Sequence, residues 1–422
     1  MKNHPLIKSL LALRGNPKYC IFTEPLWGIP NQLYAPFATV YMSALLLTDR
    51  QIGLVASVSM FFQAVSALVS GAITDKLGRR KTTVIFDLIA WSIPALLWAF
   101  SQNFWWFITA AALNGLWQVT NNSWMCLLVE DAEKSSIADI FSFLHITGQL
   151  AVVFAPFSGL LVNRLGIVAT MRIIYLFTFV SMTAKFVILY FYSTETGIGE
   201  TRMKETGGMS LFAVMSGYGA ILRRILSSAD MRLALVVSAT LSIASLIMGN
   251  FFGLLTTHDL MVPQHFLAYF PILRSIIILV FMFGIQSGLS RFGYKGPMLA
   301  GGGFYFASHI VLILSPRGNL IVPFVYIFLE ACAHALVMPR RDSIMILLVD
   351  PAERARIFSI MTVLVLAVNI PFGYFAGWLS EIDRRLPFGL DIAIFVLVFF
   401  IIAGSKRLSA GNLDAADSEA VT

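Results

Sequence analysis

The stretch GAITDKLGRRK, residues 71–81, separates two long apolar runs and is the most informative part of the sequence. Gly71 has no side chain, so a helix at this point can pack closely against a neighbour. Asp75 can oppose the positive N-terminus of another helix, and Gly78 permits a tight turn. The four basic residues of the stretch are typical of a loop on the cytoplasmic side of a membrane. We therefore predict a short cytoplasmic loop between two membrane helices.

The composition of the whole chain agrees with a membrane protein. Of its 422 residues, 58% are hydrophobic and 13% are charged, and the mean hydropathy is +0.79. A soluble domain carries about 25% charged residues. Within lipid only helices and closed barrels satisfy the backbone hydrogen bonds. Barrel strands are about ten residues long and alternate in polarity. The apolar runs of this chain instead have the length of about 20 residues that crosses the hydrocarbon as a helix.

These runs predict an all-α membrane protein with about twelve transmembrane helices. The expected helices cover residues 19–47, 51–74, 82–101, 103–129, 137–162, 170–193, 231–256, 264–289, 296–315, 319–348, 356–379 and 388–404.

Lysine and arginine are distributed unevenly over the connecting loops. If both termini are cytoplasmic, 22 of the 30 basic residues lie on the cytoplasmic side and six lie outside, with Lys185 and Arg274 inside helices. This excess predicts that orientation in the cytoplasmic membrane. It also explains the net charge of +7 without a nucleic-acid partner, because basic loops face an anionic leaflet.

The chain contains an internal repeat. MCLLVEDAEK at residues 125–134 aligns with MILLVDPAER at residues 345–354, and IFS at 140–142 aligns with IFS at 357–359. A duplicated six-helix unit is typical of transporters built from parallel repeats. The alternative is chance similarity between apolar stretches, but the polar loop shared by both copies argues against it.

The repeat divides the chain into two pseudo-symmetric six-helix bundles with short polar segments around them. We expect a cytoplasmic N-terminal segment, an N-terminal bundle, a cytoplasmic linker whose residues 210–226 form an amphipathic surface helix, a C-terminal bundle and a cytoplasmic tail. Their boundaries are 1–18, 19–193, 194–229, 230–404 and 405–422.

Residues 71–81 fill every defining position of G-x-x-x-D-K/R-x-G-R-K/R-K/R. This pattern resembles the cytoplasmic motif of the major facilitator superfamily, and the duplicated twelve-helix plan extends the resemblance over nearly the whole chain. The resemblance implies a secondary transporter that works by alternating access and needs no cofactor. It also implies that Asp75 meets the start of the eleventh helix, near Arg356.

The motif is expected to gate the cytoplasmic side. Arg79 can pair with a carboxylate at the end of the fourth helix, Glu130 or Asp131. The alternative is a loop whose charges serve only topology, but topology requires neither Asp75 nor the glycines. A second copy of the motif has Ser290 in place of the acid, so we expect an asymmetric gate. The candidate gating residues are Gly71, Asp75, Gly78, Arg79 and Arg80.

Three ionisable residues lie near the middle of predicted helices in the second half. Arg274 is in the eighth helix, and Glu330 and His334 share one face of the tenth. Such groups are costly in a membrane, so each is a candidate for substrate binding or proton coupling. Arg274 suits an anionic or zwitterionic substrate. The alternative is a static Arg274–Glu330 ion pair.

The first half supplies mostly uncharged polar groups. Asn31 lies in the first helix, and Asn114 and Gln118 form a polar stripe on the fourth. They are candidates for substrate contact, with hydrogen bonds between helices as the alternative. Glu24 is a candidate proton or substrate group or an interfacial residue. Lys185 lies on the sixth helix, where we expect it to snorkel or pack.

The sequence contains no nucleotide-binding loop, so we expect the energy to come from an ion or substrate gradient, with protons as the expected ion. Residues 155–160, APFSGL, match an export motif only in part, so proton-coupled efflux and uptake symport both stay open. We expect a small-molecule substrate, contact with the lipid bilayer, a monomer and no bound metal. A membrane sensor or scaffold without transport is the competing class. An enzyme is not expected, because no clustered carboxylates or histidines are present.

Substituting Asp75 tests the gating hypothesis. Asp75→Asn removes the charge that opposes a helix N-terminus, so transport by the reconstituted protein should slow while membrane insertion stays intact. Transport at the unchanged rate would refute the gating role.

Overall fold

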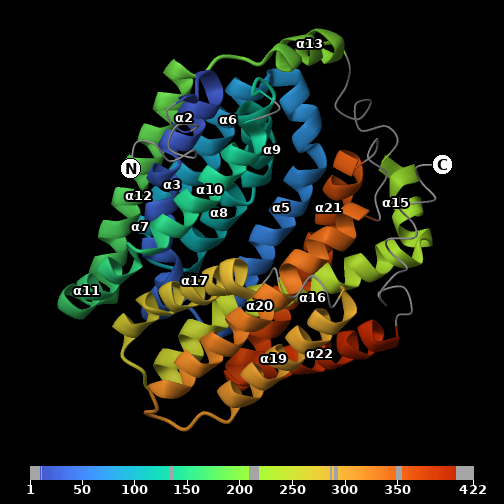
Figure 1. The fold of residues 1–422 in the computed structure, drawn as a ribbon. Coiled ribbons are helices and arrows are strands. Elements are labelled where there is room, and N and C mark those ends of the chain that lie inside the picture. The colour runs from blue at the N-terminus through green and yellow to red at the C-terminus, as the bar shows by residue number, and fades with distance from the viewer. Residues whose placement is uncertain are drawn as a thin grey trace. The chain divides into compact units, whose positions relative to one another are not determined.

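The structure, a computed structural model, describes residues 10, 12–133, 136–208, 218–285, 288, 293–347 and 354–404. These residues form helices joined by short connections, and no strand occurs among them (Figure 1). The all-α fold predicted from hydropathy is therefore confirmed. Most of the N-terminal segment, part of the linker, residues 289–292 of the second motif copy and the C-terminal tail lie outside the described residues.

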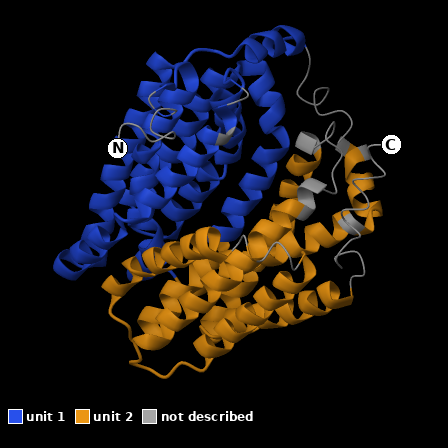
Figure 2. Ribbon diagram, in the orientation of Figure 1, with its two compact units in different colours: residues 1–47, 55–218 blue, residues 48–54, 219–422 orange. Residues whose placement is uncertain are grey.

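The internal contacts divide the chain into two units (Figure 2). Unit 1 comprises residues 1–47 and 55–218, and unit 2 comprises residues 48–54 and 219–422. Each unit has a hydrophobic core of its own. The core of unit 1 contains Trp124 and Phe143, and that of unit 2 contains Tyr305 and Phe395.

The helices of unit 1, together with the start of α5 that belongs to unit 2, are α2 (Gly15–Thr23), α3 (Pro25–Tyr34), η1 (Ala35–Phe37), α4 (Ala38–Ala44), α5 (Asp49–Leu77), α6 (Arg79–Asp87), η2 (Leu88–Ser92), α7 (Ile93–Ala99), α8 (Phe104–Asn114), α9 (Trp117–Val129), α10 (Ile137–Val152), α11 (Ala155–Leu165), α12 (Ile167–Tyr192) and α13 (Gly197–Thr206).

The remaining helices belong to unit 2, apart from Tyr218 at the start of α15, which belongs to unit 1. They are α15 (Tyr218–Ser227), α16 (Ala229–Leu254), η4 (Leu255–Asp259), η5 (Gln264–Ala268), α17 (Phe270–Val280), η6 (Phe281–Ile285), α19 (Lys295–Ile313), α20 (Ile321–Leu347), α21 (Arg354–Ile382) and α22 (Leu386–Gly404).

Ten segments of the described chain are long and apolar enough to cross a membrane. The first and fourth predicted helices are absent from these ten because each is interrupted. Residues 15–44 form the successive pieces α2, α3, η1 and α4, with prolines at the starts of α3 and η1. Residues 104–129 form α8 and α9, which are separated at Gly115 and Leu116. Proline lacks a backbone N–H and so ends the regular hydrogen bonding of a helix. With these two segments the expected plan of about twelve crossings is complete.

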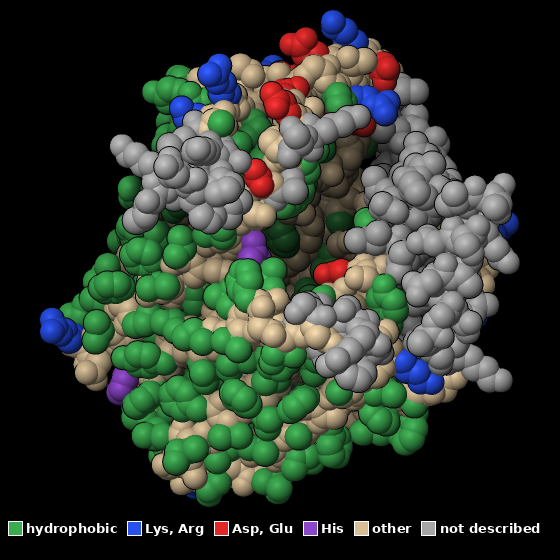
Figure 3. All heavy atoms as spheres, viewed as in Figure 1, with side chains coloured by type: hydrophobic (Ala, Val, Ile, Leu, Met, Phe, Trp, Pro, Cys, Tyr) green, Lys and Arg blue, Asp and Glu red, His purple; other side chains and the backbone are tan. Residues whose placement is uncertain are grey.

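The surface matches a lipid environment. Large apolar side chains such as Phe191 in α12, Phe283 in η6 and Phe400 in α22 are exposed. Hydrophobic side chains cover much of the visible face of each unit, and charged side chains gather at the end of unit 1 that carries α13 (Figure 3). Exposed apolar area on this scale marks a surface that contacts lipid or another apolar partner.

The break between α8 and α9 lets α5 approach closely. A Cβ atom added at Gly115 would lie 2.5 Å from the Phe62 Cβ and 2.8 Å from the Ser59 carbonyl oxygen. The Ser66 hydroxyl also donates a 2.7 Å hydrogen bond to the Gly115 carbonyl. Packing at this point therefore requires a residue without a side chain.

Gly115→Ala should lower the melting temperature of the purified protein, because overpacking of this kind costs about 1–3 kcal/mol. The matched control is Gly148→Ala in α10, where no atom lies within 4 Å of the added Cβ. Alanine favours a helix by about 1 kcal/mol over glycine, so this variant should melt no lower than the original. Equal melting of both variants would contradict the packing role of Gly115.

Candidate functional site

The loop between α5 and α6 turns at Gly78. This residue has φ +86°, a left-handed conformation that side chains other than glycine rarely adopt. A Cβ atom here would also lie 2.5 Å from the Glu195 Oε2. Glycine is therefore needed both for the turn and for the approach of Glu195.

Glu195 caps the first turn of α6. The backbone N–H of Arg79 donates to its Oε1 at 2.8 Å, and that of Arg80 donates to its Oε2 at 3.1 Å. The first N–H groups of a helix have no partner within the helix, and a carboxylate there is stabilising. Since Glu195 follows α12, the residues after the last long helix of unit 1 contact the loop between α5 and α6.

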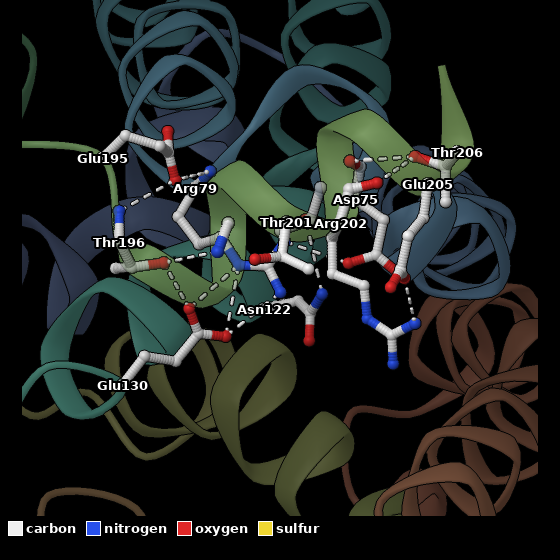
Figure 4. Close-up of polar contacts among 12 residues, drawn as sticks. Asp75, Arg79, Asn122, Glu130, Glu195, Thr196, Thr201, Arg202, Glu205 and Thr206 are labelled. Carbon is white, nitrogen blue, oxygen red and sulfur yellow. Dashed lines mark hydrogen bonds and ion pairs between the residues drawn. The ribbon is translucent and has the colours of Figure 1, made fainter. Parts of the chain in front are cut away.

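The Arg79 side chain is the centre of the charge cluster (Figure 4). Its guanidinium donates to both oxygens of Glu130 at 3.0 and 3.1 Å and to the Asp75 Oδ1 at 2.9 Å. Arg79 is buried, and the Glu130 side chain is 12% exposed. Glu130 is one of the two partners predicted for Arg79. The other, Asp131, accepts instead from the Asn16 side chain at 3.3 Å.

Helix α13 fastens the linker to the same cluster. The Thr196 hydroxyl donates to Glu130 and accepts from the backbone N–H of Gly199. Through this second bond Thr196 caps the start of α13. At the other end of α13, the Thr206 hydroxyl donates to the Asp75 carbonyl at 3.1 Å. Figure 4 shows these groups converging from both ends of α13. The loop is therefore held in one conformation by residues of unit 1.

The remaining motif residues have separate surroundings. Arg80 donates to the Tyr190 carbonyl, and its guanidinium lies 5.0 Å from the centre of the Tyr190 ring. Gly71 lies within α5. The side chain of Arg356, near which the resemblance places the partner of Asp75, lies outside the described residues.

A buried ion pair occupies the membrane part of unit 1. The Lys185 ammonium in α12 lies 2.7 Å from the Glu24 Oε2 and also faces the rings of Trp124, at 5.2 Å, and Trp27, at 6.0 Å. The side chains of Lys185 and Glu24 are 6% and 10% exposed. Of the two predicted roles of Lys185, snorkelling and packing, the structure shows packing in the interior, and it adds Glu24 as a partner of opposite charge.

The uncharged candidates of unit 1 are Asn31, Asn114 and Gln118. Asn114 donates to the Ala90 carbonyl at 2.9 Å, which is a hydrogen bond between neighbouring helices. Asn31 in α3 and Gln118 in α9 are half-buried. Within the described part of the chain, no hydrogen bond or ion pair joins these residues to Glu24.

In unit 2 the structure brings Arg274 and Glu330 together. The Arg274 Nε and Nη2 donate to the two oxygens of Glu330 at 2.8 and 3.1 Å, a bidentate pair between α17 and α20. Glu330 is buried, whereas 28% of the Arg274 side chain is exposed. His334 lies one turn further along α20, half-buried and close enough to interact electrostatically with both.

Sequence reasoning missed several partners. Glu195 and Thr196 were assigned only to a loose linker, although a threonine followed by an acidic first turn is a helix-start signal. His309 and Asp391 lie in α19 and α22 and face each other. Both are ionisable residues within apolar helices, and the high cost of charge in a membrane is the sequence signal that marks them. Asp49, which accepts from Arg384 at 2.8 Å, carried no signal because its partner is far away in the sequence.

Among the described residues, no group of three or more His, Cys, Asp or Glu side chains is arranged to hold a metal ion.

A family model described as "Major Facilitator Superfamily" matches residues 27–368. The chain belongs to the major facilitator superfamily. Among curated relatives in sequence, a protein named multidrug resistance protein MdtG from Yersinia enterocolitica is 26% identical over 176 residues, which is 40% of this chain and 41% of that protein. A protein of the same name from a Rahnella strain is 32% identical over 96 residues, 22% of this chain and 23% of the relative. These alignments thus span well under half the length of the relatives.

The fold of this superfamily member is shared with solved transporter structures. The nucleoside transporter NupG gives a TM-score of 0.70 at 15% identity, with 92% of this chain and 98% of the other covered. The xylose transporter XylE from E. coli gives 0.67 at 13% identity, with 96% and 98% covered. A bacterial homologue of the lysosomal transporter Spinster gives 0.71 at 13% identity, with 94% and 97% covered. At these identities the likeness establishes the fold alone.

Substitutions at the buried pair of unit 1 should be strongly non-additive. Lys185→Met leaves Glu24 buried without a partner, which costs about 3–5 kcal/mol, whereas adding Glu24→Leu should restore most of the lost stability. The measurement is thermal unfolding of both single variants and the double variant.

The matched control is the exposed pair Arg202–Glu205, in which both side chains are more than half exposed. Breaking it with Arg202→Met should cost about 1 kcal/mol or less. Additive effects of the Lys185 and Glu24 substitutions would show that the pair is not energetically coupled.

Proposed function

We propose that this superfamily member is a secondary active transporter that moves a small solute across the membrane by alternating access. Its family and its multi-pass architecture support transport as the general class. The observation that carries the assignment further is the Arg274–Glu330 pair, because a charged pair in a membrane is costly and is usually retained for a function.

The geometry of this pair suits substrate binding. Glu330 occupies the Nε and Nη2 edge of the Arg274 guanidinium. Arginine has five N–H donors in a planar fork, so the part of the guanidinium that stays exposed can donate to an anionic or hydrogen-bond-accepting group of a solute. Glu330 keeps the arginine in place and offsets its charge when no solute is bound. A solute with a carboxylate, or a zwitterion, fits this arrangement.

Proton-coupled export is the favoured direction. Both curated relatives carry the name multidrug resistance protein, which indicates efflux in those proteins. Residues 155–160 match an export motif only in part, so they do not decide the direction, and uptake symport is the competing mechanism. Energy comes from an ion gradient, with protons as the proposed ion.

Ligand stabilisation tests the role of Arg274. Purified protein is heated with organic anions, zwitterions and lipophilic cations such as ethidium, because a solute that binds only the folded state raises the melting temperature. We expect an anion or zwitterion to stabilise the protein, and Arg274→Gln/Glu330→Gln to lose that stabilisation. The double variant avoids leaving one buried charge alone.

Arg341→Gln is the control, since Arg341 pairs with the exposed Asp342 on the same helix. It should keep the stabilisation seen with the original protein. If the double variant were stabilised equally by the same solute, Arg274 and Glu330 would be a structural pair only.

Transport itself is tested in proteoliposomes with the most strongly stabilising solute, with and without a pH gradient. Accumulation that depends on the gradient supports proton-coupled transport, and its direction separates efflux from uptake. If no solute crosses under any gradient while ligand binding persists, the competing class of membrane sensor is favoured.

A further inference from the structure

Unit 2 contains a second ionisable pair that the proposed substrate site does not use. His309 in α19 and Asp391 in α22 are each 1% exposed, and the His309 Nε2 lies 3.3 Å from the Asp391 Oδ2. Both residues lie in segments that are long and apolar enough to cross a membrane. Neither belongs to the family motif.

The hydrogen bonds of His309 fix the position of one ring proton. Its Nδ1 lies 2.8 Å from the Tyr305 carbonyl oxygen and 3.1 Å from the Ser308 hydroxyl. The Ser308 hydroxyl itself donates to that carbonyl at 2.7 Å. A carbonyl oxygen can only accept, so Nδ1 must carry the proton that makes its bond. In a neutral ring, Nε2 then has only a lone pair.

That lone pair points at an acceptor. An ionised Asp391 has only acceptor oxygens, so a neutral His309 and an ionised Asp391 would place two acceptors 3.3 Å apart at a site that is 1% exposed. One additional proton removes the conflict in either of two ways. It converts the imidazole to imidazolium, or it converts the carboxylate to a carboxylic acid. In this arrangement the pair therefore holds one proton in addition to the proton on the His309 Nδ1.

The contact between the two residues is longer than those of the other buried pairs. The His309 Nε2 and the Asp391 Oδ2 are both buried and have no well-aligned hydrogen bond with any residue in the described part of the chain. The Lys185–Glu24 and Arg274–Glu330 pairs differ, since their closest contacts are 2.7 and 2.8 Å. A static pair gains from close geometry, because only good hydrogen bonds repay the loss of solvation. The His309–Asp391 contact, at 3.3 Å, is longer than those of the other two pairs.

The surroundings of the pair are mainly aromatic. The centre of the His309 ring lies 5.5 Å from that of Tyr326, 5.4 Å from Phe395 and 6.0 Å from Phe388. The ionisable groups that interact with the pair are Tyr305 on its own helix α19, and Tyr326 and Glu330 on α20, with Arg274 of α17 beyond Glu330.

The pair lies close to the proposed substrate site. Tyr326 and Glu330 are four residues apart on α20, so they share one face with about 6 Å of rise between them. His309 packs against Tyr326 and interacts electrostatically with Glu330. A change of one charge at the pair therefore alters the potential at Glu330, because the interior screens charges weakly.

We infer that His309 and Asp391 form a proton-binding site, distinct from the Arg274–Glu330 site, which takes up and releases one proton and links its occupancy to substrate binding at Glu330. The link to substrate rests on the function proposed above, whereas proton binding at the pair does not.

Proton binding is measured without any substrate. The purified full chain in lipid nanodiscs is examined from about pH 5 to about pH 9, the range in which histidine charge commonly changes. Infrared difference spectra report protonated carboxyl groups, and ¹⁵N spectra of histidine-labelled protein report imidazolium. We expect one of these signals to titrate, to disappear in Asp391→Asn or His309→Gln, and to persist in the surface control Asp342→Asn. If neither signal titrates, or if both variants retain it, the inference is refuted.

Coupling is measured in proteoliposomes with the solute identified by thermal stabilisation. Asp391→Asn should reduce accumulation driven by a pH gradient more than it reduces exchange at equal pH. The fold reduction of accumulation should be about ten times that of exchange, which is the effect expected of a typical coupling free energy. His309→Gln should do the same if Asp391→Asn does not fold. Equal reductions of accumulation and exchange would refute the link to substrate. If the original protein moves no solute, the proposed function fails, and the spectra alone decide whether the pair binds a proton.

Discussion

The hydrocarbon of a membrane contains no water to solvate a charge, and this constraint determines how the chain arranges its ionisable residues. The buried charges meet partners within the same unit, as in Arg79 with Glu130, Lys185 with Glu24, and Arg274 with Glu330. Each pair joins helices that are far apart in sequence, so charge neutralisation also specifies which helices become neighbours. Because an unpaired buried charge costs several kcal/mol, these contacts exclude alternative packings more strongly than apolar contacts, which are similar against lipid and against protein.

Much of the fold could be predicted from the sequence because lipid imposes so few solutions. Runs of apolar residues determine the crossings, and the interruptions of the first and fourth crossings occur at Pro25 and Gly115, residues that weaken regular helices. The pairing of Arg274 with Glu330 was also foreseeable, since both are ionisable and lie mid-helix. The pairing of Glu24 with Lys185 was not foreseeable, because sequence gives the depth of a residue in the membrane but not the direction in which its side chain points. Glu195 was missed for a related reason, since nothing local indicates that a residue after α12 returns to α6.

The pairs differ in the distance between their charged atoms and in how much of each side chain is exposed. Arg79 is held by two carboxylates and surrounded by α13, an arrangement suited to keeping a loop in one conformation. Arg274 keeps part of its side chain exposed, which leaves donors for a solute. His309 and Asp391 are fully buried yet loosely aligned, which suits a proton, the one ligand small enough to enter such a site. Binding of solutes and of protons can thus occur at neighbouring positions without the two competing for one carboxylate.

The capping of α6 by Glu195 has a consequence for how the protein is made. The groups that hold Arg79, namely Asp75, Glu130, Glu195 and Thr196, are all encoded before the second half of the chain. At about 5–20 residues per second, a ribosome needs on the order of 10–40 s to synthesise the roughly 200 residues that follow. During that interval the first half can already complete its charge network in the membrane. No residue of the second half is needed for these contacts with Arg79.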